Sequence, residues 1–447
     1  HTYASSVSLT LQRNFLPMNL KLFFVAALAI FATLSLSAFA ADAPAPRPIG
    51  GDRDAHGCLP AAGYQWCART AKCERSWELA KKENFANTSE GFAQFCKDPA
   101  AKTTIAEKVL AWKKLDTVAF KGKQDDISFV TPDIGWYGNG AGKLYQTIDG
   151  GATWKERANL PGTFIRALGF IDANNGFLGN IGIDYFPGVT DPKPLYRTRD
   201  GGATWQPVTN VQGPTVKGIC AIDILRRTFI DSGVLRERVI VHAAGRVGGP
   251  AFLMRSLDGG ETWRSIDLSA HTAMIMDVKF FDEMNGVIAG ASDSDTEKSH
   301  ARLIVTHDGG MTWKTAYEST RPYEITWKLS FPTREVGYAT IQKYNPDPKV
   351  TQHYVAKTTD GGRTWREVPM ANDVADREFG VGFVTVDTGW VGTAKGGYQT
   401  SDGGKTWNFV EMGRAVNKIR IVPTEVKNNN RFVGYAIGTE VRKFDAR

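Results

Sequence analysis

The 447-residue sequence predicts an all-β fold: a seven-bladed β-propeller, closed by an N-terminal strand that completes the last blade, plus a small N-terminal disulfide-bearing module. An eight-residue phrase recurs six times at intervals that suit one four-stranded sheet each. The chain after the sixth copy supplies only three strands of a further sheet, and four cysteines cluster far upstream. We therefore expect upstream residues and a signal peptide over 1–40, a linker over 41–56, the module over 57–100 and the propeller over 111–447.

Each copy of the phrase reads Ser/Thr-x-Asp-Gly-Gly-x-Thr-Trp, and successive aspartates lie 51, 58, 50, 52 and 42 residues apart. Upstream of each copy, apolar and polar residues alternate in short runs such as 127–130 and 143–146, which is typical of strands. The phrase then forms the turn between the third and fourth strands. Its members are Asp149, Asp200, Asp258, Asp308, Asp360 and Asp402, with Trp154, Trp205, Trp263, Trp313, Trp365 and Trp407.

The residue types of the phrase favour a structural role. The Asp carboxylate can accept backbone N–H groups within a tight turn, and the glycines can adopt positive φ. The Trp can cover the hairpin as an apolar lid. Catalytic acids or calcium ligands are the alternative, but a calcium loop needs further oxygens and a closing Glu, which these copies lack. We expect no metal, no cofactor and no catalytic residue among them.

Ring closure is predicted from the two ends of the repeat region. After the sixth copy, strands are expected over 419–422, 431–436 and 440–444, without a fourth. The segment 112–120 starts with Trp112-Lys113, like Trp154-Lys155 after the first phrase. We expect this segment to supply the missing strand and leave no open edge.

The N-terminal region predicts export. A start at Met18 is followed by Lys21, an apolar run and small residues, a pattern typical of a signal peptide cut after Ala40. An uncleaved anchor is the alternative. The net charge of +7 is too small for a chain of this length to indicate nucleic acid or an anionic membrane as a partner. We expect a periplasmic or extracellular protein with no stable membrane insertion after cleavage.

Four cysteines, Cys58, Cys67, Cys73 and Cys96, predict two disulfides in the small module. Zinc binding is disfavoured because the spacing lacks a Cys-x-x-Cys pair. A bridge between Cys67 and Cys73 could staple a hairpin, with Cys58–Cys96 closing the module, but the pairing stays open. Cys220 stands alone and is expected to be a buried, inert thiol.

The binding surface is expected on the face opposite the repeated turns. Turns between first and second strands are short, whereas the connections 180–194, 242–250, 291–302 and 342–353 are long, and long ordered loops often carry function. Basic and aromatic residues there suit an acidic or peptide partner, the alternative being scattered solvated charges. They are Arg166, Tyr185, Arg246, His300, Arg302, Arg321, Tyr323, Lys343, Tyr344, His353, Arg377, Lys395 and Arg414.

The phrase resembles the Asp-box, or bacterial neuraminidase repeat, of the sialidase superfamily. The longer units 129–154 and 383–407, with their Gly-Trp pairs, most resemble the photosystem II stability and assembly factor family. That resemblance implies a non-catalytic propeller that chaperones a membrane protein outside the cytoplasm. The long insertions and the cysteine module depart from it, so we expect a binding or assembly factor for an envelope complex.

Other Asp-box proteins suggest other functions. A glycoside hydrolase of the exo-sialidase kind, with a glycan ligand, is the main alternative. Sialidases carry an Arg-Ile-Pro phrase in the first blade, which is missing here, and their catalytic set cannot be placed on this chain. A sortilin-like receptor is a third possibility. Fold alone does not choose among these.

Overall fold

The computed structural model describes residues 53–54, 56–83, 87–96, 111–122, 124–372, 376–424 and 432–446. The chain divides into two compact units, residues 1–99 and 100–447, which are treated separately below. The expected signal peptide and most of the expected linker lie outside the described residues. Among the described residues, no helix is both long and apolar enough to cross a membrane.

The small unit is a hairpin followed by two helices. Its elements are a 3-10 turn η1 (Pro60–Ala62), β1 (Tyr64–Cys67), β2 (Lys72–Arg75), α1 (Ser76–Glu83) and α2 (Ser89–Cys96). Two disulfides join Cys58 to Cys73 and Cys67 to Cys96. Leu79 and Phe92 are buried beside the second bridge.

The pairing of Cys67 with Cys73 was therefore wrong, and the strand register explains why. Cys73 lies opposite Trp66, whereas Cys67 lies opposite Lys72. Because successive side chains of a strand point to opposite faces, the two cysteines face away from each other. Each instead reaches a cysteine outside the hairpin, which ties the hairpin to the residues before it and to α2.

The large unit is built almost entirely of strands, which form seven sheets within its described residues. The first holds β4 (Asp126–Phe129), β5 (Gly135–Gly138), β6 (Lys143–Thr147) and β7 (Lys155–Asn159). The second holds β8 (Ile165–Phe170), β9 (Gly176–Asn180), β10 (Leu195–Thr198) and β11 (Gln206–Pro207). The third holds β13 (Ala221–Asp231), β14 (Val234–Gly245), β15 (Phe252–Ser256) and β16 (Trp263–Asp267), with β12 (Val211–Gln212) added parallel to β16.

The remaining sheets repeat the same order. The fourth holds β17 (Met274–Phe280), β18 (Gly286–Ala291), β19 (Ala301–Thr306) and β20 (Lys314–Glu318). The fifth holds β21 (Glu324–Ser330), β22 (Gly337–Lys343), β23 (Gln352–Thr358) and β24 (Arg366–Asn372). The sixth holds β25 (Glu378–Phe383), β26 (Gly389–Thr393), β27 (Gly397–Thr400) and β28 (Asn408–Val410). The seventh holds β29 (Lys418–Pro423), β30 (Phe432–Ile437), β31 (Val441–Asp445) and the early strand β3 (Lys113–Lys114).

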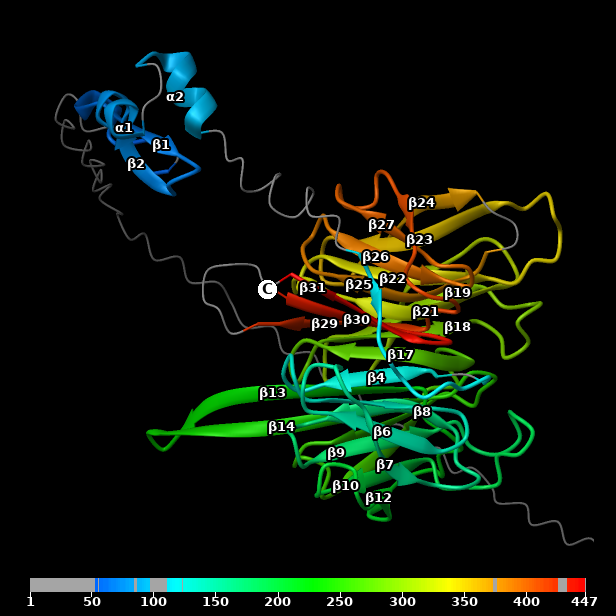
Figure 1. Cartoon of the computed structure of the whole chain (residues 1–447). Coiled ribbons are helices and arrows are strands. Elements are labelled where there is room, and N and C mark those ends of the chain that lie inside the picture. The colour runs from blue at the N-terminus through cyan, green and yellow to red at the C-terminus, as the bar shows by residue number, and fades with distance from the viewer. Residues whose placement is uncertain are drawn as a thin grey trace, which may run out of the picture. The chain divides into compact units, whose positions relative to one another are not determined.

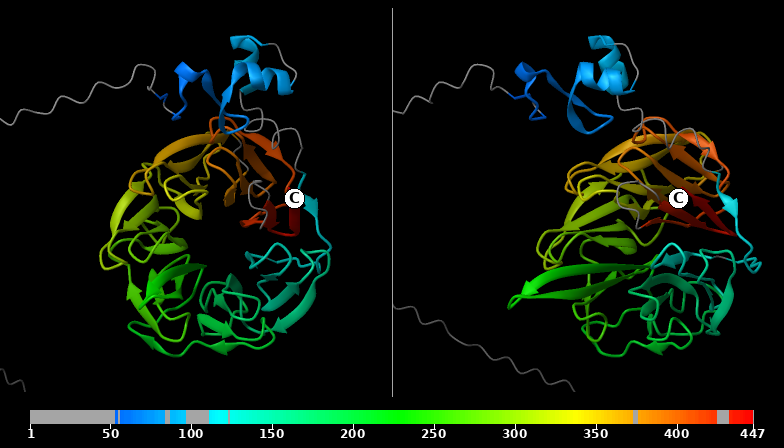
Figure 2. Two further views of the ribbon diagram at one scale, coloured as in Figure 1. Left: turned by 90° about the vertical axis from the view of Figure 1, so that its left-hand side faces the viewer. Right: turned by 60° about the vertical axis from the view of Figure 1, so that its left-hand side comes forward.

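The sheets follow one another around a central axis, and the red seventh sheet lies beside the cyan first one (Figure 2). Strand β3 pairs with β31, with Lys113 opposite Lys443. The paired segment is much shorter than the expected 112–120. The N–H group of Leu115 still donates to the carbonyl of Val441, but beyond this residue the chain leaves the sheet. Val118 is 53% exposed.

The first and second strands of the third sheet form a far longer hairpin than those of the other sheets. Strands β13 and β14 continue as a two-stranded ribbon well beyond the rest of their sheet, as Figure 1 shows. The turn itself has only two residues, Ser232 and Gly233, as expected of such turns, but the length of the two strands that lead to it was not predicted. The extension explains why the third aspartate follows the second by 58 residues, the longest interval in the repeat.

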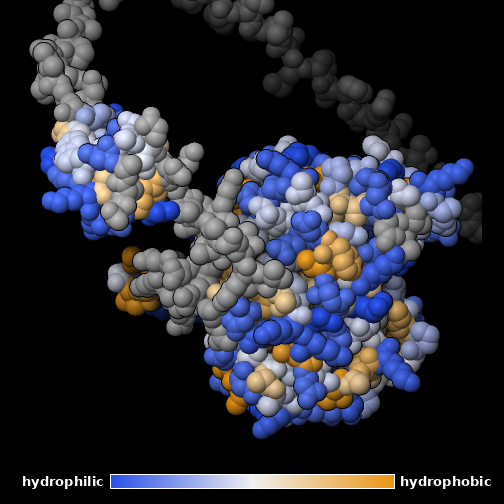
Figure 3. All heavy atoms as spheres, turned by 45° about the horizontal axis from the view of Figure 1, so that its top comes forward, coloured by the Kyte–Doolittle hydropathy of each residue, from blue (hydrophilic) through white to orange (hydrophobic). Residues whose placement is uncertain are grey.

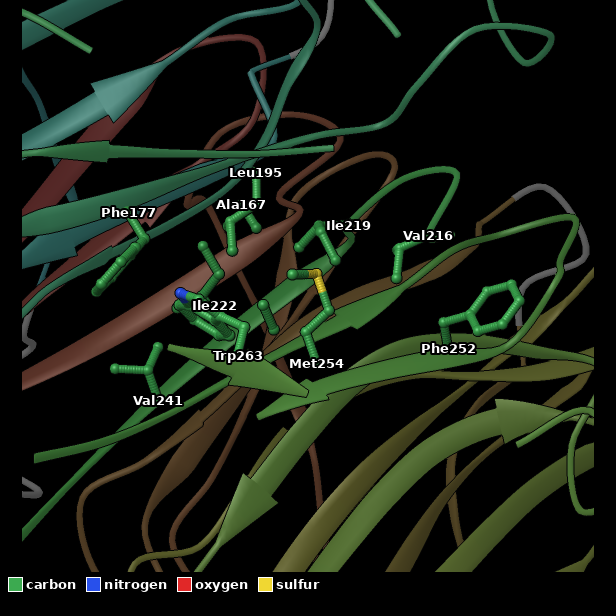
Figure 4. Packing of buried hydrophobic residues seen from close by; sticks show 11 residues of the cluster. Ala167, Phe177, Leu195, Val216, Ile219, Ile222, Val241, Phe252, Met254 and Trp263 are labelled. Atoms are coloured by element: carbon green, nitrogen blue, oxygen red, sulfur yellow. The ribbon is translucent and has the colours of Figure 1, made fainter. Parts of the chain in front are cut away.

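The core consists of apolar layers between neighbouring sheets. In the layer shown in Figure 4, Phe177 of β9 meets Trp263 of β16, their ring centroids 5.4 Å apart, with Ile222, Val241 and Met254 around them. Aspartates of the first strands add a second link between sheets. The carboxylate of Asp126 accepts the N–H of Leu168 in the next sheet at 2.9 Å.

Candidate binding site at the loop end

The register of each sheet places the repeated turns at one end of the large unit. In the fifth sheet Gly337, which starts β22, lies opposite Thr358, which ends β23 and begins a repeated turn. The N–H of Gly361 in that turn bonds to the carbonyl of Glu335 at 2.8 Å. We call this the turn end. The long connections after β9, β14, β18 and β22 leave the opposite end, here called the loop end.

The repeated turns hold their aspartates internally. Asp149 accepts hydrogen bonds from the hydroxyl of Thr153 at 2.6 Å, its N–H at 2.9 Å and the hydroxyl of Thr147 at 2.8 Å. These bonds lower the pKa of Asp149 to about 2, and the bond from the Thr153 hydroxyl contributes most. The other five aspartates accept hydrogen bonds from the equivalent Ser or Thr residues of their own turns, and their pKa values are also lowered. The carboxylates therefore stabilise turns.

The glycines and tryptophans complete each turn. Gly150 and Gly151 have φ of 68° and 88°, and both glycines of the other five copies are also positive. The indole N–H of Trp205 donates to the carbonyl of Gly202 at 3.0 Å, and four further copies repeat this bond. In the first copy the indole nitrogen of Trp154 is buried without a hydrogen-bond partner among the described residues.

At the loop end, four of the expected binding residues converge. We define the mouth cluster as Arg166, Tyr185, Trp327, Tyr344 and Arg377. The Arg166 guanidinium lies 5.0 Å from the Trp327 ring, and that of Arg377 lies 4.2 Å from the Tyr344 ring. Tyr344 packs on the apolar group that contains Trp327. The cluster joins strands β8 and β21, the residues just after β22 and just before β25, and the loop after β9.

Arg166 is the most unusual member, because a cationic side chain here is only 2% exposed. Its Nη1 lies 3.4 Å from a carboxylate oxygen of Asp125. Burial is the largest single effect and opposes its charge, but Asp125, Cys220, Tyr185 and Asp126 together outweigh it and raise the pKa of Arg166. Neither Nη1 nor Nη2 donates a hydrogen bond to any described residue. Apart from the 3.4 Å ion-pair contact with Asp125, Nη1 and Nη2 therefore have no acceptor among the described residues, which is costly unless an anion or water supplies one.

The two phenols of the cluster remain neutral donors. Burial raises the pKa of Tyr344 to about 12, although the nearby charge of Arg377 opposes this effect. Burial also raises the pKa of Tyr185, which is 38% exposed. The Tyr344 hydroxyl already donates to the side-chain oxygen of Gln342, so Tyr185 is the phenol that can donate a hydrogen bond to an approaching acceptor.

A cavity of about 400 Å³ opens beside Tyr344 and Arg377. Its lining residues are Lys343, Tyr344, Asn345, Pro346, Asp376, Arg377, Phe379 and Ala394. The Arg377 side chain is exposed and forms no ion pair with the described residues. The cavity therefore combines aromatic walls with an available cation.

Inward from the mouth cluster, the first strands carry a buried set of charges. Lys418 lies 3.5 Å from Asp277, and the amine of Lys328 donates to the carbonyl of Met276 at 2.9 Å. Burial lowers the pKa of Lys328 to about 7, despite the attraction of Asp277. The indole of Trp327 donates to Asn417 at 2.9 Å, which links the mouth cluster to the seventh sheet.

Several expected binding residues instead hold loops in place. Arg246 is 7% exposed, and its guanidinium bonds to the carbonyls of Gly249, Ile181 and Ile183. Arg321 forms ion pairs with Glu324 at 2.6 Å and Glu367 at 2.8 Å. These guanidinium groups are engaged within the protein, so they do not join the mouth cluster.

The rest of the expected residues are placed as follows. Arg302 pairs with Glu318 at 2.7 Å, and the ring of His300 bonds to the carbonyl of Ser319. His353 is buried against Glu378 at 2.5 Å. Tyr323 has a positive φ of 63°, Lys343 donates to the carbonyl of Val350, and the N–H of Lys395 bonds to Asp376. Arg414 is exposed and forms no ion pair within the described part of the chain.

Residue patterns alone did not indicate Asp125, Trp327 or Phe379. Asp125 immediately precedes β4, and the aromatic pair lies on first strands of the fifth and sixth sheets. An aromatic residue on an inner strand, where most copies have smaller side chains, was the available signal. Among the described residues, no group of His, Cys, Asp and Glu side chains could hold a metal ion.

Known proteins resemble this chain either over a short stretch of sequence or in fold. No family model matches the chain. A xyloglucanase from Paenibacillus sp. is 27% identical over 139 residues, which is 30% of this chain and 12% of that protein. The chain thus spans about an eighth of the length of this curated relative.

Solved structures are similar over most of the chain. The structure of YCF48 bound to D1 peptide matches with a TM-score of 0.50 and 16% identity over 75% of this chain and 98% of that one. YCF48 from Cyanidioschyzon merolae matches with a TM-score of 0.51 and 17% identity, over 75% and 99% of the two chains. At these identities the likeness concerns the fold alone: the chain is an all-β protein with β-propeller neighbours.

Proposed function

We propose that this chain is an exported, non-catalytic seven-bladed β-propeller that binds a carboxylate-bearing protein or peptide segment at the mouth cluster. It would act as a binding or assembly factor for an envelope or membrane protein complex. The seven sheets in sequence, with β3 on β31, support a closed ring. The observation that carries the binding proposal is the buried Arg166 guanidinium, whose Nη1 and Nη2 donate no hydrogen bond to a described residue.

The ligand class follows from the chemistry of the cluster. A guanidinium presents paired N–H groups that match the two oxygens of a carboxylate. Arg377 adds a second, exposed cation, while Tyr185 and Tyr344 provide aromatic contact area with few rotatable bonds. A side-chain or chain-end carboxylate next to an apolar residue fits both features. That a similar fold, YCF48, has been solved with a peptide supports the choice of a peptide ligand.

The experiment is a fluorescence-anisotropy titration with a panel of dye-labelled peptides that differ only in a free or amidated C-terminus and in Asp/Glu or Asn/Gln side chains. We expect binding to require the carboxylate, and Arg377→Gln to weaken it at least tenfold, about 1.4 kcal/mol. Arg414→Gln is the matched control, since Arg414 is an exposed arginine without an ion pair among the described residues. Equal affinity for peptides with and without the carboxylate, or an equal loss of affinity in both variants, would refute the proposal.

Glycoside hydrolysis is the competing function, and the 139-residue similarity to a xyloglucanase is its support. A glycosidase needs two carboxyl groups that face the scissile bond. Near the mouth, Asp125 is buried beside Arg166 and Glu378 is buried beside His353. Incubation with xyloglucan oligosaccharides and fluorogenic sialosides tests this alternative. Turnover that survives removal of a repeated-turn aspartate but not of a loop-end carboxylate would favour it.

Export is a further part of the proposal. The basic, apolar and small-residue pattern that starts at Met18 supports cleavage after Ala40. Mass spectrometry of the protein recovered from the periplasm or medium would give the new N-terminus. A protein retained in the cytoplasm with residues 18–40 attached would contradict it.

A further inference from the structure

The ribbon formed by the outer halves of β13 and β14 projects from the turn end, as Figures 1 and 2 show. Every residue from Arg226 to Arg238 is exposed. The strands stay paired up to Asp231 and Val234, and Ser232 and Gly233 form a two-residue turn with φ of 51° and 80°. Such a turn suits the twist of a hairpin, so the ribbon is a defined element with an exposed end.

The end of this ribbon is apolar. Ile230 and Leu235 lie opposite each other and are 75% and 72% exposed. Val234 is 56% exposed and Phe229 is 37% exposed. Because neighbouring residues of a strand alternate between faces, apolar side chains occupy both faces of the ribbon end. The hydrophobic end is visible at the left of Figure 3.

Arginines lie behind this apolar end. Arg226 and Arg227 precede it on β13, while Arg236 and Arg238 follow it on β14. Arg227 lies opposite Arg238, three residues from Ile230 and Leu235 respectively, which corresponds to roughly 10 Å along a strand. The acidic residues of the ribbon are already paired: Asp231 with Arg236 at 2.9 Å and Glu237 with Arg226 at 2.8 Å. Arg227 forms no ion pair with the described residues and stays available.

We propose that this ribbon end docks on the surface of an anionic lipid bilayer. Segments that bind at the membrane interface bury apolar side chains about 5–10 Å into the headgroup region, with basic groups at the level of the phosphates. The spacing between the apolar pair and Arg227 matches that depth. A long side chain such as arginine can extend further toward the headgroups.

Two features favour lipid over a protein partner. The apolar side chains lie on both faces of the ribbon end, so an end-on approach to a fluid surface buries all of them. A protein groove that takes one face of the ribbon would leave the other exposed. The free cation Arg227 and the excess of arginine over acid in the ribbon complement anionic headgroups.

The experiment is co-sedimentation of the exported full chain, its N-terminus determined by mass, with vesicles of equal parts phosphatidylglycerol and phosphatidylcholine. The test variant is Ile230→Ser with Leu235→Ser. The matched control is Ile148→Ser with Met311→Ser, because these two residues are 70% and 79% exposed but lie in separate repeated turns. Thermal unfolding checks that all variants fold.

We expect the wild type and the control to pellet with the anionic vesicles and the test variant to lose at least tenfold in partition coefficient. Arg227→Gln should lose severalfold, and pure phosphatidylcholine should bind more weakly. No pelleting of the wild type, or equal pelleting of test and control variants, overturns the proposal. A wild-type dimer in light scattering that the test variant loses, without vesicle binding, assigns the ribbon to self-association and also overturns it. Peptide binding at the mouth cluster would be unaffected in every case.

Discussion

Removal of the Trp112 side chain tests whether the N-terminal segment is part of the large unit's core. Trp112 is 4% exposed, and its ring lies edge-on to Phe444 at 4.4 Å and Trp390 at 5.7 Å. These partners belong to the seventh and sixth sheets, far along the chain. The side chain thus joins the start of the repeat region to its end.

The magnitude follows from this packing. Truncation of a buried Trp to Ala costs about 3–5 kcal/mol, which includes the cavity that remains. The indole N–H of Trp112 is buried and has no hydrogen-bond partner among the described residues. Removal of this unpaired group offsets roughly 1 kcal/mol of the cost of the truncation. We therefore expect Trp112→Ala to lower the free energy of unfolding by about 3 kcal/mol.

The assay is urea unfolding followed by far-ultraviolet circular dichroism. Trp77→Ala is the control, since Trp77 is 47% exposed in the small unit and its removal should cost under about 1 kcal/mol. A loss below about 1 kcal/mol for Trp112→Ala would refute the reasoning. It would mean that the segment around β3 is not needed to hold the ends together.

Four further predictions concern stability. Asp149→Ala removes three hydrogen bonds from its turn and should cost about 2 kcal/mol in urea unfolding, with peptide affinity unchanged. Because the pKa of Asp149 is lowered to about 2, its stabilisation is present above its unfolded value near 4 and is lost as pH falls toward 2, so Asp149→Asn should flatten acid unfolding there. The pKa of Lys328 is lowered to about 7 in the folded protein, so between pH 7 and 10.5 its amine is protonated in the unfolded chain but not in the folded one. The free energy of unfolding should therefore rise with pH across this window, and Lys328→Met should flatten the rise. Cys67→Ser with Cys96→Ser should destabilise the small unit by about 3 kcal/mol in a melt monitored by hydrogen exchange, without effect on exchange in the large unit.

Much of the fold could be predicted because its determinants are local and repeated. The phrase around Asp149 combines a carboxylate, two glycines and a Trp within eight residues, so it encodes its own turn wherever it occurs. The strand pattern between copies then follows from alternation. The β13–β14 ribbon was not predicted. Two signals were available: the longest interval between aspartates contains it, and apolar pairs flank the turn-forming segment 231–233.

The candidate site was only partly predictable, since it depends on residues from distant sheets. The loop end could be chosen from connection lengths, and four of its residues do meet. The sequence could not show how each arginine is held in the structure. Arg166 and Arg246 lie on similar stretches of sequence, yet Nη1 and Nη2 of Arg166 donate no hydrogen bond to a described residue, whereas Arg246 bonds to three carbonyls. That difference arises from Trp327 and Asp125, which the sequence places far from each other.

The central claim, that a peptide carboxylate binds at the loop end, is tested most directly by photo-crosslinking. A bound peptide that carries a photoreactive group beside its carboxylate would be activated and the crosslinked residues identified by mass spectrometry. The account predicts crosslinks to the segments around Tyr185, Tyr344 and Arg377. Crosslinks to the cavity of about 450 Å³ at the turn end, which Lys279 and Arg420 line, would contradict it.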